Sequence, residues 1–174
     1  MKYAAPLLCL VLGLAAPPFA LAETAAPSKA EDVAKAATDP AAFARVAASS
    51  NMLEIESSTL AMERSQNADV QAFAQKMIDD HTAAGEKMKA IAEDAETEVP
   101  AAMNDADMKA LQALQDAQNF DQAYLELQVK AHEEAVALFD TFAAEGEGPL
   151  RDFAEETLPT LKDHQGHVRS LTGA

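Results

Sequence analysis

Four long stretches of this chain carry apolar residues every three or four positions, and this spacing constrains the fold most. On an α-helix such positions share one face, because successive residues turn by about 100°. Each stretch therefore predicts one amphipathic helix, and the expected helices cover about residues 40–66, 70–95, 120–145 and 149–171. No stretch alternates as a strand would. The predicted fold class is all-α, a four-helix bundle in which the apolar faces cover one another.

Residues that typically start or end helices mark the limits of these stretches. Asp39 followed by Pro40 predicts the first helix start, because Asp caps free backbone N–H groups and Pro fits the first helical position. Asp69 is expected to cap the second helix in the same way. The Gly-Glu-Gly-Pro segment at residues 146–149 separates the third helix from the fourth.

The connection over residues 96–119 is longer than a tight turn. Asn104 or Asp105 is expected to cap a short extra helix there, between the second and third long helices. The sequence leaves open whether this connection forms a hairpin or crosses to the opposite end of the bundle.

The N-terminus has the pattern of a cleaved signal peptide over residues 1–22. Lys2 supplies a positive start, residues 4–16 are apolar, and Ala-Leu-Ala at residues 20–22 gives the small-residue cleavage pattern. An apolar stretch of about 13 residues is too short for a transmembrane helix, which needs about 20. We therefore expect an exported, periplasmic protein with no transmembrane segment in the mature chain.

The chain after the expected cleavage site divides into a leader and one domain. Residues 23–38 are rich in Ala and carry almost no large apolar residue, so they predict a flexible leader. Residues 39–174 form the predicted helical domain. The single cysteine, Cys9, lies in the segment that cleavage removes, which excludes disulfides and cysteine-based metal sites in the mature protein.

The formal net charge of −16 limits the partners that the protein can bind. Because nucleic-acid phosphates and anionic membranes repel such a surface, no nucleic-acid function is expected. The charge favours solubility and a weak attraction of cations. The sequence does not identify a protein partner.

Four polar residues interrupt the apolar stripes. Glu54, His81 and His164 fall on the inner faces of the first, second and fourth long helices, and His132 falls on the flank of the third. Each lies near the middle of its helix, so all four are expected to meet at one level of the core. Such buried groups need partners, because a buried polar group without one costs several kcal/mol.

Several interpretations of this Glu/His layer remain open. The four residues can bind one Zn, Fe, Mn or Cu ion, since imidazoles and a carboxylate suit these metals. Alternatively, the protein is a non-catalytic structural, interaction or stress-related periplasmic bundle. Its Glu/His layer is then only a hydrogen-bonded core network that fixes the helix register, as buried polar groups commonly form. A third interpretation is a pH-responsive protein that uses buried histidines.

Three further residues are expected near this layer. Tyr124 and Gln128 are close enough on the third helix to support the ring of His132, and Tyr124 also fits the apolar stripe. His167 falls at the edge of the fourth stripe, where it lies either on the surface or beside the site. Asp80 is expected to point into solvent.

No pattern in the sequence identifies a catalytic residue. There is no Gly-rich phosphate loop, and the serines lack a convincing His–Asp arrangement. His132 is followed by two glutamates, but residue 136 is Val and not the second histidine of a zinc-protease motif. The sequence therefore favours a binding or structural protein over an enzyme.

Several segments resemble, in order along the chain, the domain-of-unknown-function family 4142. They lie at residues 51–56, 70–81, 120–124, 131–133 and 158–164, and include VQAFAQKMIDDH and LPTLKDH. The resemblance covers about residues 40–171. It implies a ferritin-like helical bundle that is exported or associated with the outer membrane, and it implies no established reaction.

The histidines depart from the pattern of true ferritins. Ferritin-type di-iron sites use Glu-x-x-His motifs, whereas the residues three positions before the three inner histidines are apolar: Ile78, Val129 and Leu161. At most one mononuclear site is expected, and no ferroxidase or iron-storage activity.

Overall fold

The computed structural model describes Met1 and residues 29–173. The expected signal peptide, residues 1–22, and the first part of the expected leader lie outside the described residues. Within the described part, every regular element is a helix, and there are six of them. In chain order they are α1 (Lys29–Lys35), α2 (Pro40–Arg64), α3 (Ala68–Asp94), α4 (Asp105–Gln115), α5 (Phe120–Glu145) and α6 (Pro149–Thr172). The predicted all-α class is confirmed.

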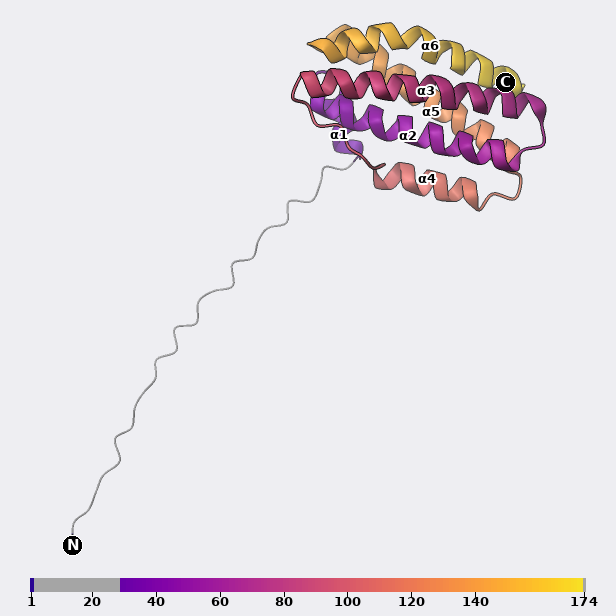
Figure 1. The fold of residues 1–174 in the computed structure, drawn as a ribbon, viewed down its shortest axis with the longest axis horizontal. Helices are drawn as coiled ribbons and strands as arrows, with labels where there is room; N and C mark the ends of the chain where they lie inside the picture. Colours follow the sequence, from indigo (N-terminus) through magenta and orange to yellow (C-terminus); the bar gives the residue numbers. More distant parts are fainter. Residues whose placement is uncertain (2–28, 174) are drawn as a thin grey trace.

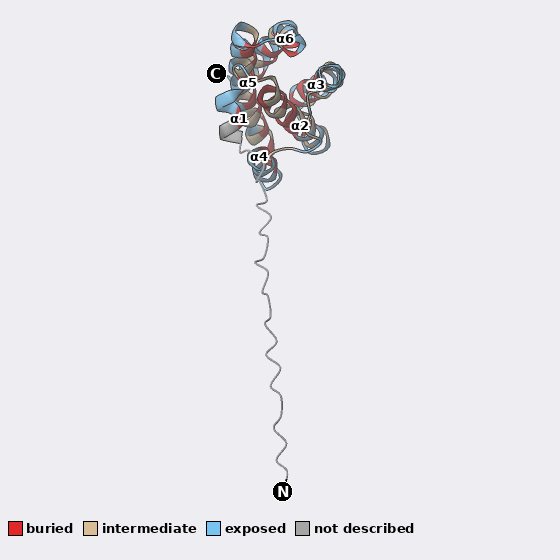
Figure 2. Ribbon diagram, turned by 90° about the vertical axis from the view of Figure 1, so that its left-hand side faces the viewer, coloured by how far each residue is buried: buried red, intermediate tan, exposed pale blue. Residues whose placement is uncertain are grey.

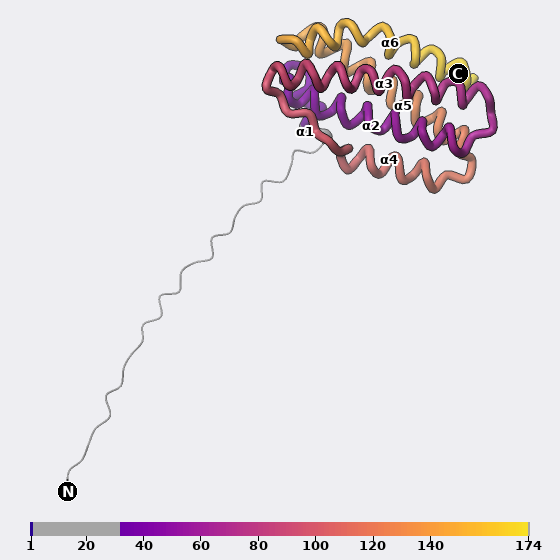
Figure 3. Tube along the Cα trace, viewed as in Figure 1, coloured from indigo at the N-terminus to yellow at the C-terminus, as the bar shows by residue number. Residues whose placement is uncertain are grey.

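The four long helices lie side by side as two antiparallel pairs. Short turns join α2 to α3 and α5 to α6, and α2 also packs on α5 while α3 packs on α6 (Figure 1). The chain leaves α3 at one end of the molecule and enters α5 at the other, with α4 running the length between them along α2 and α5 (Figure 3). The connection over residues 96–119 therefore crosses over.

The helix starts follow the expected cap chemistry with one exception. Asp39 caps α2 by accepting two backbone N–H groups, with Pro40 at the first helical position, and Asn104 caps α4. Asn67 caps α3, so the prediction of Asp69 was wrong. The reason is the backbone: Asn67 is extended and its side chain accepts the N–H of Asp69, which already lies inside the helix.

The expected leader is partly ordered. Residues 29–35 form α1 instead of flexible chain, and α1 packs on α2. A helix this short is not stable alone, and two contacts supply its stability. Asp32 pairs with Arg45 of α2 at 2.6 Å, and Ala36 is completely buried in the core. Both contacts depend on the folded domain, so the composition of the segment does not reveal them.

Buried residues face inward on all four long helices (Figure 2). They form two apolar clusters. One cluster contains Phe43 of α2, Phe142 of α5 and Phe153 of α6, and the other contains Phe73 of α3 and Tyr124 of α5. Along every long helix, a buried polar residue separates the positions that belong to one cluster from those that belong to the other. These residues are Glu54, His81, His132 and His164.

A second buried polar group joins α4 to α2. Ser49 of α2 donates to the Asp107 carboxylate at 2.6 Å and accepts the backbone and side-chain N–H groups of Asn104 at 2.9 and 2.8 Å. The Asn104 amide also donates to Asp107 at 2.8 Å. These hydrogen bonds fix the crossover connection to the domain. No helix within residues 29–173 combines the length and apolar character needed to span a membrane.

Candidate metal centre

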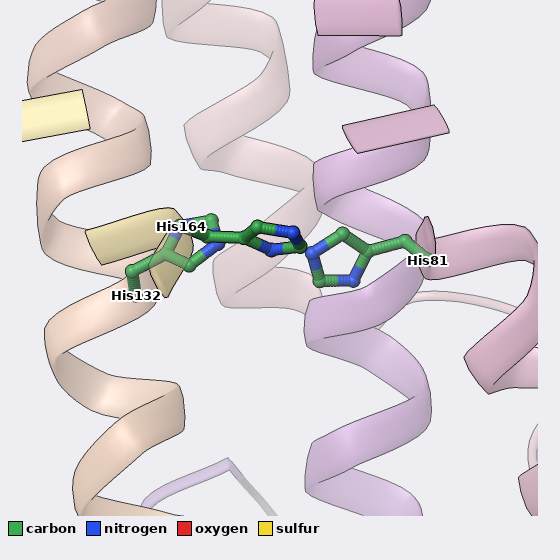
Figure 4. A group of neighbouring side chains, drawn as sticks. All are labelled: His81, His132 and His164. Carbon is green, nitrogen blue, oxygen red and sulfur yellow. The ribbon is translucent and has the colours of Figure 1, made fainter. Parts of the chain in front are cut away.

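Three histidines from three helices meet in the middle of the core. His81 comes from α3, His132 from α5 and His164 from α6, and their rings face one another at one level (Figure 4). All three side chains are buried, with exposed fractions of 5%, 0% and 1%. One ring nitrogen from each lies within 4.8 Å of the others. The expectation that these residues share one level of the core agrees with this geometry.

Each ring uses one nitrogen to bond an acceptor outside the cluster. Nδ1 of His132 lies 2.9 Å from the backbone carbonyl of Gln128, and Nε2 of His164 lies 2.7 Å from the Asp80 carboxylate. Nδ1 of His81 lies 3.0 Å from the side-chain carbonyl of Asn51. A carbonyl or carboxylate oxygen offers only lone pairs, so the ring nitrogen must donate in every case. These contacts assign the N–H of each imidazole.

The other nitrogen of each ring has no hydrogen-bond partner. These atoms are Nε2 of His81, Nε2 of His132 and Nδ1 of His164, and all three are buried. In a neutral imidazole whose first nitrogen carries the proton, the second nitrogen is a lone-pair acceptor. Three acceptors cannot hydrogen-bond one another. The centre of the cluster is therefore a set of three buried lone pairs without donors.

The electrostatics of the site keep the rings neutral. Burial, with a smaller contribution from the neighbouring imidazoles of His132 and His164, lowers the pKa of His81 to about 3. Burial also lowers the pKa of His132 to about 4, although the bond to the Gln128 carbonyl opposes this. The pKa of His164 falls for the same reason, against the effect of Asp80. At neutral pH the three lone pairs are available to an electrophile.

Glu54 lies on the outer side of the cluster. Its oxygens are 3.3 Å from Nδ1 of His81 and 3.4 Å from Nδ1 of His132, which are the nitrogens that carry the protons. The structure thus brings Glu54 to the predicted level but does not place it among the three converging nitrogens. A carboxylate at this position holds the N–H sides of two rings outward, which directs their lone pairs inward.

The relation of this chain to known proteins comes from one family match. A model of the family described as "Domain of unknown function (DUF4142)" matches residues 24–171. The chain belongs to this family. No curated protein matches the chain, and no solved structure matches it. The resemblance in the sequence motifs is thereby confirmed, and the chemistry of this DUF4142 domain has to be derived from its own side chains.

The residues expected beside His132 in this DUF4142 domain have distinct positions. Gln128 supports His132 through its backbone carbonyl, while its side-chain amide donates to Ser57 at 3.0 Å. The Tyr124 hydroxyl pairs with Ser58 at 2.9 Å, and burial raises its pKa above the usual range. His167 is exposed and packs edge-on against a core phenylalanine. It lies on the surface, not beside the cluster.

Two supporting residues were missed by the sequence reasoning. Asp80 was expected in solvent, but it is half-buried and accepts the N–H of His164 from the neighbouring helix. Burial alone would raise its pKa, yet the hydrogen bonds from Lys76 and His164 bring the pKa below its ordinary value. Asn51 lies one helical turn before Glu54, and this spacing was a usable signal for it. Asp80 had no such signal, because its partner is on α6.

The cluster fits a transition-metal ion by geometry and by donor chemistry. The ring centres are 5.7, 5.5 and 5.4 Å apart. An ion about 2.0–2.1 Å from one nitrogen of each ring would hold the ring centres roughly 5.2–5.6 Å apart. In addition, each ring donates its one N–H to a carboxylate, a backbone carbonyl or a side-chain amide oxygen, as metal-bound histidines usually do.

Proposed function

We propose that this DUF4142 protein is an exported, ferritin-like four-helix bundle that binds one transition-metal ion through His81, His132 and His164. One observation carries the proposal: each of three buried imidazoles has one nitrogen without a hydrogen-bond partner, and the three rings offer ligand nitrogens within 4.8 Å of one another. If these histidines served only to fix the helix register, each of these nitrogens would be expected to have a hydrogen-bond donor, because an unpaired buried acceptor costs about 1–3 kcal/mol.

The arrangement of the helices supports the ferritin-like assignment. Two antiparallel pairs joined by one long crossover connection are the topology of ferritin-like bundles, and such bundles build metal sites from side chains of facing helices. The absence of Glu-x-x-His spacing argues for a single ion and against di-iron chemistry. Export to the periplasm rests on the N-terminal sequence pattern of residues 1–22.

Each residue has a defined task in this proposal. The three histidines bind the ion as neutral ligands, and Asp80, Asn51 and the Gln128 carbonyl hold their rings in the required tautomer. Glu54 supplies a negative charge beside the ion without a place among the three nitrogens. Three neutral imidazoles favour Zn, Cu or Fe, whereas Mn prefers oxygen ligands.

The metal-free interpretation requires the histidines to hydrogen-bond within the cluster. A closed network among the three imidazoles requires at least one proton between the rings, and the outer acceptors already hold the proton of each ring. A second proton on a ring is disfavoured because burial lowers the pKa of His81 and His132 to about 3 and 4. The observed contacts therefore support metal binding over a closed network.

The direct experiment is a titration of metal-free protein with Zn²⁺ and with Co²⁺, followed by calorimetry and by the visible spectrum of Co²⁺. We expect one ion per chain and a Co²⁺ spectrum typical of a four-coordinate nitrogen site. His132→Ala should weaken binding by about 100-fold or more, because it removes one of three protein ligands. His167→Ala is the matched control, since it removes an exposed histidine from α6 and should leave the affinity unchanged.

A wild-type protein that binds neither ion would contradict the proposal. Equal losses in His132→Ala and His167→Ala would also contradict it, because binding would then depend on surface histidines. Circular dichroism of each variant checks that the helices remain folded.

A further inference from the structure

A small cavity lies against the histidine cluster. It has a volume of about 40 Å³, and His81, His164 and Glu54 form its inner wall. A space of about 10–15 Å³ is enough to hold one water molecule. The cavity therefore has room for a molecule of two or three heavy atoms directly beside the proposed ion.

The rest of the cavity wall is mostly apolar. It includes alanine, methionine, leucine and phenylalanine side chains from all four long helices, among them Ala47, Ala84, Ala135 and Phe153. The polar residues of this wall are Ser50, Asn51, Asp80, Thr157 and Thr160. The apolar part of this wall favours small apolar molecules.

The cavity reaches the surface between α3 and α6. Ala84 of α3 and Thr157 of α6 are half-buried at its rim, and Thr160 of α6 is exposed. A small solute can thus reach the inner wall without unfolding of a helix. Ala84 lies one turn after His81, so its side chain stands between the rim and the cluster.

Three histidines leave an open position on a four-coordinate ion, as in sites where water or a substrate completes the ligand set. We infer that this open position faces the apolar cavity and that its ligand is a small neutral diatomic molecule, such as O₂, NO or CO. This inference rests on the proposed metal site. It adds the chemical class of the ligand, which neither the family nor the histidine cluster alone specifies.

The test uses CO as the probe and the Cu⁺-loaded protein. Cu⁺ loading is first measured by competition with a chromophoric chelator, and CO binding is then measured by the infrared C–O stretch of the metal-bound molecule. We expect one Cu⁺ per chain and one CO band.

Two alanines of α3 provide a matched pair of variants. Ala84→Leu fills the cavity from its rim and should weaken CO binding by about tenfold or more without changing the Cu⁺ affinity. Ala83→Leu adds the same side chain at the neighbouring exposed position and should change neither. If Ala84→Leu does not fold, Ala84→Val, which adds less volume, should show a smaller loss in the same direction.

The outcomes separate the two proposals. A protein that does not bind Cu⁺ overturns the metal site and this inference together. A protein that binds Cu⁺ but shows no CO band overturns only the inference. A CO band that is equal in wild type and in the cavity-filled variant also overturns the inference.

Discussion

Two buried polar groups each include a residue of α2, Ser49 in one and Glu54 in the other, and these residues lie little more than one helical turn apart. The hydrogen bonding of the two groups differs. In the first, Ser49, Asn104 and Asp107 exchange hydrogen bonds of 2.6–2.9 Å, and the Ser49 hydroxyl both donates and accepts. In the second, the histidine layer beside Glu54, three ring nitrogens are buried with no hydrogen-bond partner. Ser49 and Asp107 are as deeply buried as the three histidines, and Asn104 is half-buried.

The difference shows what each group contributes. A network in which donors meet acceptors stabilises the fold, and here it fixes α4 and the crossover connection to α2. A cluster of acceptors without donors costs stability in the metal-free protein and becomes favourable when an electrophile binds. Burial alone therefore does not distinguish a structural network from a site, whereas hydrogen-bond satisfaction does. Four predictions test this comparison, in order of decreasing effect.

Acid should destabilise the metal-free protein through the histidine layer. The folded-state pKa of His81 is about 3 and that of His132 about 4, both below the value of about 6.5 in an unfolded chain. As the pH falls, the unfolded chain therefore takes up protons first. The stability is fully present above about pH 6.5 and is lost as the pH falls toward 4.

We expect a loss on the order of 3 kcal/mol between pH 7.5 and pH 5, measured by urea unfolding. His132→Leu should reduce this pH dependence, because it removes one of the buried rings. A free energy of unfolding that stays constant over this pH range would contradict the view that the histidine layer, unlike the Ser49 network, lacks satisfied hydrogen bonds.

Asp107→Ala should damage the satisfied network. It leaves the Ser49 hydroxyl and the Asn104 amide without their common acceptor, which costs about 2 kcal/mol in the free energy of unfolding. The Zn²⁺ affinity of the folded protein should not change. Asp105→Ala, at an exposed position in the same helical turn, should cost less than half as much. Equal losses in both variants would argue against a structural role of the network.

Asp80→Asn should weaken the metal site by about tenfold, or about 1.4 kcal/mol, because the carboxylate that orients His164 is lost. The neighbouring Asp79 is exposed and bonds only within its own helix, to Gln75. Asp79→Asn is therefore the matched control, with unchanged affinity in the same Zn²⁺ titration. An effect of Asp79→Asn as large as that of Asp80→Asn would indicate a general charge effect instead of ring orientation.

His132→Leu should have the smallest effect on the metal-free protein. It replaces a buried ring that has an unpaired nitrogen by an apolar side chain of similar size, so the free energy of unfolding at pH 7.5 should change by less than about 1 kcal/mol. The stabilisation of the wild type by Zn²⁺ should disappear in this variant. A large destabilisation without metal would place the histidine layer in the same class as the Ser49 network.

The long helices and the level of the histidines follow from local sequence signals. Asp39 with Pro40 and the break at residues 146–149 define helix ends, and the position of His81 within an apolar stripe directs it inward. Such signals act within one or two turns of a helix, which is why they can be read from the sequence alone.

The features that the sequence did not reveal depend on contacts between distant segments. Asp80 joins the site because α6 brings His164 within 2.7 Å of it, and α1 is stabilised by the pairing of Asp32 with Arg45 and by the burial of Ala36. The orientation of Glu54 is a further case. Helical spacing predicts its inward direction, but which side of the imidazoles it faces depends on the packing of α2 against α3 and α5.

The protonation of the three histidines in metal-free protein at neutral pH tests the account most directly. Nitrogen-15 NMR of the imidazoles distinguishes a nitrogen that carries a proton from one that carries a lone pair. We predict protons on Nδ1 of His81, Nδ1 of His132 and Nε2 of His164, with lone pairs on the three opposite nitrogens, whose signals shift when one equivalent of Zn²⁺ is added. A proton on any of those opposite nitrogens, or no shift with Zn²⁺, would contradict the account.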